Sequence, residues 1–248
     1  MIATIIHPLR KITVDLSEPI DISIPLEAGP GKVSAWYVAP VRIESVRTAD
    51  WVGDVNEGGS VNFRDIYFNP HGHGTHTECA GHISKEGISV NKELKRFFFL
   101  AKLITITPDK SGSDDVITRE QIINAIGNDQ CEAIVIRTVP NDISKTTRQY
   151  SNTNPPFLHH DAALLLREKK IDHLLIDLPS VDKEQDNGKL LAHHAFWNYP
   201  EQTRLHATIT EFIFVPNEVT DGMYLLNIQM APFENDASPS KPVLYKVR

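Results

Sequence analysis

The chain has little cysteine and no long run of apolar residues. Its 248 residues include only Cys79 and Cys131 as cysteines, which excludes a disulfide framework and favours a reducing compartment. No apolar segment approaches the roughly 18 residues that a membrane-spanning helix needs. His7 and Arg10 interrupt the N-terminal apolar residues too early for a signal-peptide core. These absences predict a cytoplasmic protein that does not enter a membrane.

Long runs of one charge sign are also missing. The net charge is −7 and no long basic segment occurs, which argues against nucleic acid as a partner. The composition is ordinary for a globular protein, with 41% hydrophobic and 23% charged residues. Because neither an internal repeat nor a linker is recognisable, we expect a single domain spanning residues 1–248. The expected partner is a small-molecule substrate.

Apolar segments of strand length alternate with helical segments in the second half of the chain. Residues 97–107, 132–139 and 172–178 are predicted as buried strands, and residues 118–126 and 160–170 as helices. Thr118 and Gln121 match a capping box at the start of the first of these helices. The first and last quarters are predicted as strands and loops. This order favours an α/β fold with a mixed sheet.

Residues 69–82 are unusually rich in potential metal ligands. They hold four of the eleven histidines, one glutamate, one cysteine and three glycines. Histidine is the commonest metal ligand in proteins, and a nearby carboxylate adds an oxygen donor. In an extended segment, His76, Glu78 and His82 would share one face. The pattern therefore predicts a metal site.

His71 and His73 have the opposite parity and could join this site only if the chain turns. Glycine at position 72 or 74 would permit such a turn, and either histidine could be the additional ligand. A competing interpretation is that Thr75 and Glu78 form a capping box that merely starts a helix. That alternative explains neither the histidines nor the glycines.

Glu211 is the second informative residue. It lies in an alternating segment, residues 206–215, on the same face as Ala207, Ile209 and Ile213. An ionised carboxylate among aliphatic side chains is costly unless it is paired or binds a cation. It is therefore either an edge-strand residue reaching water or a metal ligand, and His193 nearby strengthens the second reading. Histidines and glutamates together suit zinc or manganese, and two bridging carboxylates suit two ions.

The segment from Gly74 to Glu78, followed by His82, resembles the H-x-G-T-H-x-D-x-P-x-H motif of the cyclase family of metal-dependent hydrolases. Further matches lie at residues 15–20, 177–182, 193–194 and 209–211. Three departures are present. Glu78 replaces an aspartate, Ala80 stands where a proline is usual, and the family spacing places the first histidine at Gly72.

The resemblance implies a swivelling β/β/α fold and a hydrolase of formyl-amide or lactam bonds in aromatic metabolites, an arylformamidase-like activity. It also implies a divalent cation, zinc first and manganese second, as one or two ions, and a homodimer or larger homo-oligomer. A lyase or dehydratase using the same site, and a non-catalytic protein with a structural metal, are the alternatives. The implied catalytic acid/base is His82, and the implied metal ligands, with His71 preferred to His73, are His71, His76, Glu78, His193 and Glu211.

Two further side-chain types bear on the site. Four aromatic residues could line a substrate pocket, although a core or interface role is the better explanation for each: Trp36, Trp51, Phe157 and Trp197. Cys79 could be a nucleophile, but strand parity turns it away from His76 and Glu78, so we expect a small buried residue instead.

Overall fold

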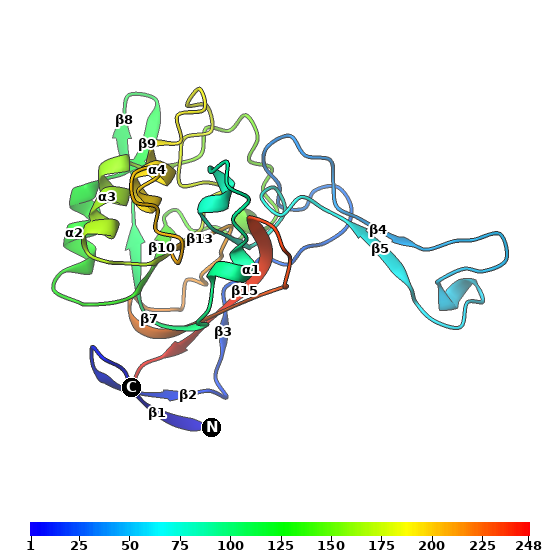
Figure 1. Cartoon of the computed structure of the whole chain (residues 1–248), viewed down its shortest axis with the longest axis horizontal. Coiled ribbons are helices and arrows are strands. Elements are labelled where there is room, and N and C mark those ends of the chain that lie inside the picture. The colour runs from blue at the N-terminus through cyan, green and yellow to red at the C-terminus, as the bar shows by residue number, and fades with distance from the viewer.

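The computed structural model describes all 248 residues, and a sheet lies at its centre (Figure 1). Seven strands of this sheet form a closed ring. The ring has the order β14-β7-β10-β12-β13-β6-β15 and closes because β14 also pairs with β15. A short strand, β3 (Ile20–Asp21), adds to β15 outside the ring. The ring strands are β6 (His76–Glu78), β7 (Phe98–Ile106), β10 (Ala133–Thr138), β12 (His173–Ile176), β13 (Thr208–Glu211), β14 (Gly222–Met230) and β15 (Ala237–Lys246).

The sheet is mixed, as the sequence predicted. Strands β7, β10, β12 and β13 are parallel neighbours, whereas β6, β14 and β15 pair with antiparallel neighbours. Helices α2 (Arg119–Ile126), α3 (His160–Glu168) and α4 (Leu191–Trp197) lie together on one side of the parallel strands (Figure 1). They connect parallel strands, which need crossover connections. The expected α/β class is confirmed.

Alternate residues of the parallel strands enter two separate cores. Ile134 and Ile136 of β10 belong to the core beneath the helices, whereas Ala133 and Val135 belong to the core on the other side of the sheet. All four side chains are inaccessible to solvent. Because both faces are covered, these strands appear in the sequence as continuous apolar runs rather than as alternating patterns.

The sequence signals at the two ends of α2 coincide with its observed boundaries. In α2, the Thr118 side chain accepts a hydrogen bond from the Gln121 backbone and the Gln121 side chain accepts one from the Thr118 backbone, which completes the predicted capping box. The helix ends at Gly127, whose φ of 59° is left-handed. Glycine adopts this conformation without a steric penalty.

Smaller elements surround the ring. A hairpin arm, β4 (Arg42–Ser45) and β5 (Arg64–Tyr67) with the loop between them, projects far from the ring (Figure 1). No helix is long and apolar enough to cross a membrane. The remaining elements are β1 (Ile2–Ile6), β2 (Lys11–Asp15), β8 (Asp109–Ser111), β9 (Asp114–Ile117), β11 (Phe157–Leu158), α1 (Val90–Glu93) and the 3-10 turns η1 (Val55–Glu57), η2 (Ala80–His82) and η3 (Ile143–Thr146).

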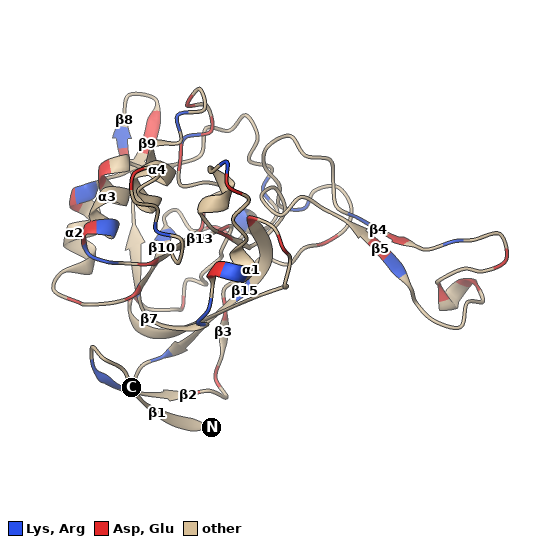
Figure 2. Cartoon of the chain, in the orientation of Figure 1, with Lys and Arg blue, Asp and Glu red and all other residues tan.

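Charges of both signs occur on α2, on α3 and along the hairpin arm (Figure 2). Within the arm, Arg47 pairs with Glu57 at 2.6 Å and Arg64 pairs with Asp54 at 3.2 Å. Such exposed pairs contribute little stability, typically about 0–1 kcal/mol. These ion pairs therefore add little to the stability of the arm.

His173, at the start of β12, generates a prediction about stability. Burial lowers the pKa of its imidazole to about 3; the ring lies 3.8 Å from that of Phe99, and Nδ1 is 2.9 Å from Thr208 Oγ1. Because the unfolded chain takes up this proton near pH 6.5, the stability from a neutral His173 is complete above pH 6.5 and declines as the pH falls towards 3. Between pH 7 and pH 5 the loss is about 2 kcal/mol.

Urea unfolding of the metal-free protein and of a His173→Gln variant would test this prediction. The variant is less stable overall, but its free energy of unfolding should fall less between pH 7 and pH 5, by about 2 kcal/mol. Equal pH slopes would show that His173 is not buried as a neutral group.

Candidate metal centre

Pairing between β6 and β13 brings two distant segments of the chain together. In the antiparallel register Glu211 lies opposite His76, and Ile209 lies opposite Glu78. His76 and Glu78 are fully buried. Residues 76–78 form a strand, so the alternative of a helix starting at Thr75 is wrong.

Glu211 lies at the last position of β13, where the strand is forced to end. The next residue, Phe212, has a left-handed φ of 54°, and the Thr75 hydroxyl donates to its carbonyl oxygen at 2.5 Å. Glu211 is only 3% exposed, so it is not an edge residue reaching water. Val181 N–H donates to its Oε1 at 2.9 Å, and its Oε2 lies 3.4 Å from His76 Nε2.

His71 enters the cluster through a turn. The Asn69 side chain accepts hydrogen bonds from the backbone N–H groups of His71 and Gly72, at 2.9 and 3.1 Å. Gly74 then takes a left-handed φ of 67° before the chain enters β6, a conformation suited to glycine. The turn leaves His71 Nδ1 3.0 Å from Glu78 Oε2.

His73 lies outside the cluster, and both of its ring nitrogens have partners. Its Nδ1 accepts from Asn69 N–H at 2.9 Å, so Nε2 carries the proton and donates to the Ala39 carbonyl at 3.0 Å. Of the two candidates left open by the sequence, the structure therefore brings only His71 to Glu78.

His193 approaches Glu78 from the first turn of α4. Its Nε2 lies 3.2 Å from Glu78 Oε1, while its Nδ1–H donates to Asp182 Oδ2 at 2.6 Å. The same carboxylate accepts from the backbone N–H groups of Ala192 and His193 at 2.7 and 3.1 Å. Asp182 thus fixes the start of α4 and the orientation of the imidazole.

His82 lies at the edge of the cluster, with a side chain that is 30% exposed. Its ring stacks on that of His71 with centroids 4.2 Å apart, and its Nε2 lies 3.9 Å from Glu78 Oε2. Residues 80–82 form the 3-10 turn η2 rather than extended chain, so the strand parity predicted for His82 is wrong. That turn nevertheless places His82 beside Glu78.

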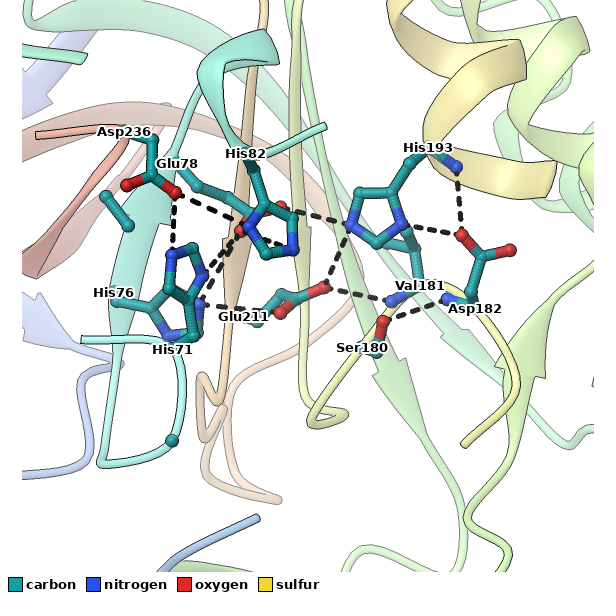
Figure 3. Close-up of polar contacts among 12 residues, drawn as sticks. His71, His76, Glu78, His82, Ser180, Val181, Asp182, His193, Glu211 and Asp236 are labelled. Carbon is teal, nitrogen blue, oxygen red and sulfur yellow. Dashed lines mark hydrogen bonds and ion pairs between the residues drawn. The ribbon is translucent and has the colours of Figure 1, made fainter. Parts of the chain in front are cut away.

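All six predicted site residues therefore converge around Glu78 (Figure 3). Three buried atoms in the cluster have no hydrogen-bond partner, namely His71 Nδ1, His76 Nε2 and Glu78 Oε2, and they lie within 4.8 Å of one another. Ligands held tetrahedrally at 2.0–2.1 Å from zinc are about 3.4 Å apart. Unpartnered buried nitrogen and oxygen atoms at this spacing fit a divalent cation.

Electrostatics in the metal-free cluster support the same fit. Burial acts to raise the pKa of Glu78, but the neighbouring His82 and His193 outweigh it and hold the pKa well below its ordinary value. Burial acts to lower the pKa of His71, yet the neighbouring carboxylates of Asp236 and Glu78 raise it to about 10. Burial also acts to lower the pKa of His193, but Asp182 and Glu78 raise it to about 10. Protonated imidazoles thus compensate the charge of Glu78, and a bound divalent cation would take over this role.

A cavity of about 330 Å³ opens beside the cluster. Besides site residues, its wall includes the apolar side chains of Trp36, Val38 and Leu190 and the charged side chains of Lys183, Glu184 and Asp186. Trp36 is half-buried and has a left-handed φ of 60°. Left-handed backbone in a bulky residue is strained and often marks a functional site. The cluster is therefore open to a small molecule on one side.

Other histidines are not part of the cluster. His194 Nδ1 contacts the Tyr199 carbonyl at 2.9 Å, and the His206 side chain is 64% exposed. Cys79 is fully buried, and burial raises the pKa of its thiol to about 12. It is not a thiolate nucleophile, in agreement with the sequence prediction.

Two carboxylates of this site were missed in the sequence analysis. Asp182 lies in the matched segment 177–182, so its buried carboxylate was a usable signal. Asp236 contacts His71 and His82, but it lies in the loop before β15 and had no local signal. Only the pairing of Ala237 with Glu78 brings it to the site.

The ring-shaped α/β fold and the histidine–glutamate cluster define a protein built to hold a divalent cation beside a small cavity. The chain belongs to the Cyclase family, whose profile, described as "Putative cyclase", matches residues 14–183.

Individual relatives agree with this assignment. The chain is 28% identical over 234 residues to a kynurenine formamidase of Bacillus thuringiensis (strain Al Hakam), covering 92% of this chain and 97% of that protein. It is 29% identical over 232 residues to the enzyme of the same name from Bacillus cytotoxicus, with the same coverage. The fold is similar to an isatin hydrolase bound to the product analogue thioisatinate, with a TM-score of 0.69, 17% identity and 93% coverage of each chain.

Exchange of His71 or His73 would test the ligand assignment. We expect His71→Asn to weaken zinc binding more than about 100-fold, because losing a ligand exceeds the 10–100-fold effect of losing a ligand's partner. His73→Asn should leave the affinity unchanged and lower the free energy of unfolding by about 1 kcal/mol, through lost hydrogen bonds. Competition with a chromophoric chelator and urea unfolding measure the two effects. Equal zinc affinities in the two variants would contradict the assignment.

Proposed function

We propose that the protein is a metal-dependent hydrolase that cleaves an amide bond, either a formamide or a cyclic amide, in a small aromatic metabolite. The carrying observation is the set of three unpartnered buried atoms on His71, His76 and Glu78 beside an open cavity. The kynurenine formamidase relatives support the formamide reaction, which makes the activity arylformamidase-like.

The proposed cation is zinc, with manganese as the alternative, because imidazole and carboxylate donors suit both. The first position would be held by His71, His76 and Glu78. Glu78 uses its second oxygen towards His193, whose Nε2 is also 4.0 Å from Glu211 Oε1. A carboxylate facing two groups of donors is suited to bridging, so one or two ions are proposed.

When bound, a divalent cation supplies Lewis-acid chemistry, polarising a carbonyl and lowering the pKa of water. The chain supplies the proton transfer. His82 Nε2 lies at the cavity, 3.9 Å from Glu78 Oε2, where it can take a proton from the attacking water and deliver it to the leaving nitrogen. Asp182 keeps His193 directed towards Glu78 during the reaction.

Trp36 is the proposed contact for the aromatic part of the substrate. It lines the cavity, and the N–H of the preceding Ala35 donates to the Gly72 carbonyl at 3.1 Å. This hydrogen bond ties the Trp36 segment to the histidine turn. A volume of about 330 Å³ is at the lower end of small-molecule sites, which suits a compact substrate.

A structural metal is a weaker interpretation, because structural zinc sites are usually closed, four-coordinate and rich in cysteine. Here a cavity reaches the cluster, and the nearby Cys79 is buried outside it. A lyase or dehydratase would use the same donors. The homo-oligomer and the cytoplasmic location remain predictions.

Replacing His82 would test the proposed acid/base role. We expect His82→Asn to lower kcat about 10²–10⁴-fold on a hydrolysed formamide or lactam, because proton transfer is lost. Bound metal, measured by elemental analysis, should remain. His194→Asn is the matched control and should keep both. Loss of metal together with activity would instead make His82 a ligand, and failure of the wild type on a formamide, lactam and lactone panel would refute the proposed function.

Replacing Trp36 would test the substrate contact. We expect Trp36→Leu to raise KM for an aryl formamide about 3–10-fold, because aromatic contacts contribute about 0.5–1.5 kcal/mol beyond burial. KM for a small aliphatic formamide should change less. Steady-state kinetics on both substrates provide the comparison, and equal changes would argue that Trp36 only shapes the fold.

A further inference from the structure

Asp236 contacts two imidazoles of the site with one oxygen. Its Oδ2 lies 2.8 Å from His71 Nε2 and 3.4 Å from His82 Nδ1 (Figure 3). The two rings stack with centroids 4.2 Å apart and planes inclined by 28°. A single carboxylate therefore lies against the edges of both rings, on nitrogens that do not face Glu78.

The contact with Asp236 decides which His71 nitrogen is available to a cation. Nε2–H donates to Asp236, so loss of the other ring proton would leave the lone pair on Nδ1, which lies 3.0 Å from Glu78 Oε2. Carboxylates that accept a hydrogen bond from a metal-binding histidine orient its ring and increase the basicity of the nitrogen that binds the metal. Asp182 does the same for His193 on the other side of Glu78. Glu78 thus lies between two carboxylate–histidine pairs, and the one with Asp236 had no assigned role.

The contact with His82 gives Asp236 a second effect that Asp182 does not have. With Nδ1 turned to Asp236, His82 presents Nε2 to the cavity side, near Glu78. We propose that Asp236 is a positioning residue. It sets the orientation of two rings together, that of the proposed ligand His71 and that of the proposed acid/base His82. This inference rests on the metal site of the proposed function.

The fold allows the side chain to be tested without disturbing its backbone. Asp236 is attached through main-chain groups, since its carbonyl accepts from Cys79 N–H at 3.0 Å and the next residue, Ala237, pairs with Glu78. Its side chain is 26% exposed. Glu234, in the same loop, is an exposed carboxylate that contacts Asn91 and Lys92 instead. Glu234→Gln is therefore a matched control for Asp236→Asn.

Metal-free wild type, Asp236→Asn, Asp236→Ala and Glu234→Gln would be titrated with zinc against a chromophoric chelator. We expect Asp236→Ala to weaken zinc binding about 10–100-fold, the range found for lost partners of ligands. Asp236→Asn, which keeps the shape and a neutral acceptor, should be affected less. Glu234→Gln should match the wild type. Unfolding of the metal-free proteins would verify that all four are folded.

A second readout concerns His82. At saturating zinc, Asp236→Ala should still show a lower kcat with little change in KM, because refilling the metal site does not reorient His82. Wild-type zinc affinity in Asp236→Ala would overturn the proposal for His71, and full recovery of kcat at saturating zinc would overturn it for His82. If wild type itself binds no zinc, the proposed function fails, which is a distinct result.

Discussion

Burial of the Glu78 carboxylate is the constraint on which the rest of the site depends. The side chain is inaccessible to solvent at the end of β6, and its Oε2 has no hydrogen-bond partner. Leaving a carboxylate uncompensated in such a place costs several kcal/mol. Four imidazoles surround it, from His71, His76, His82 and His193. Imidazole can offer a proton or a lone pair, so this arrangement can exchange protons for a cation.

The surrounding structure holds these imidazoles in a few fixed orientations. Asp182 and Asp236 each bind the nitrogen that faces away from Glu78, and Val181 N–H holds one oxygen of Glu211. The left-handed backbone at Phe212 and Gly74 ends one strand and starts the other at the places where ligands are needed. Preorganisation of this kind keeps donors at coordinating distances before a cation binds.

The departures from the family motif can be understood in the same terms. His71 stands one residue before the position that the usual spacing gives, and the turn stabilised by Asn69 compensates for this shift. Glu78 has one more methylene than the usual aspartate and lies 3.0 Å from His71 Nδ1. Both changes therefore leave the cluster intact. Asp236 contacts the His71 ring at Nε2, the nitrogen that does not face Glu78.

The sequence by itself determined the α/β class and the helix predicted at residues 118–126, because capping and apolar runs of strand length are local properties. Its histidines indicated a metal site at residues 69–82, and the cost of a carboxylate among aliphatic side chains singled out Glu211, whereas the full set of site residues was what the resemblance to the cyclase family implied. Only the tertiary structure decided between His71 and His73, because that choice depends on which ring nitrogens the Asn69 turn leaves free. Ring closure and the arrival of Asp236 likewise depend on long-range pairing of β15 with β6 and β14, which no local pattern encodes.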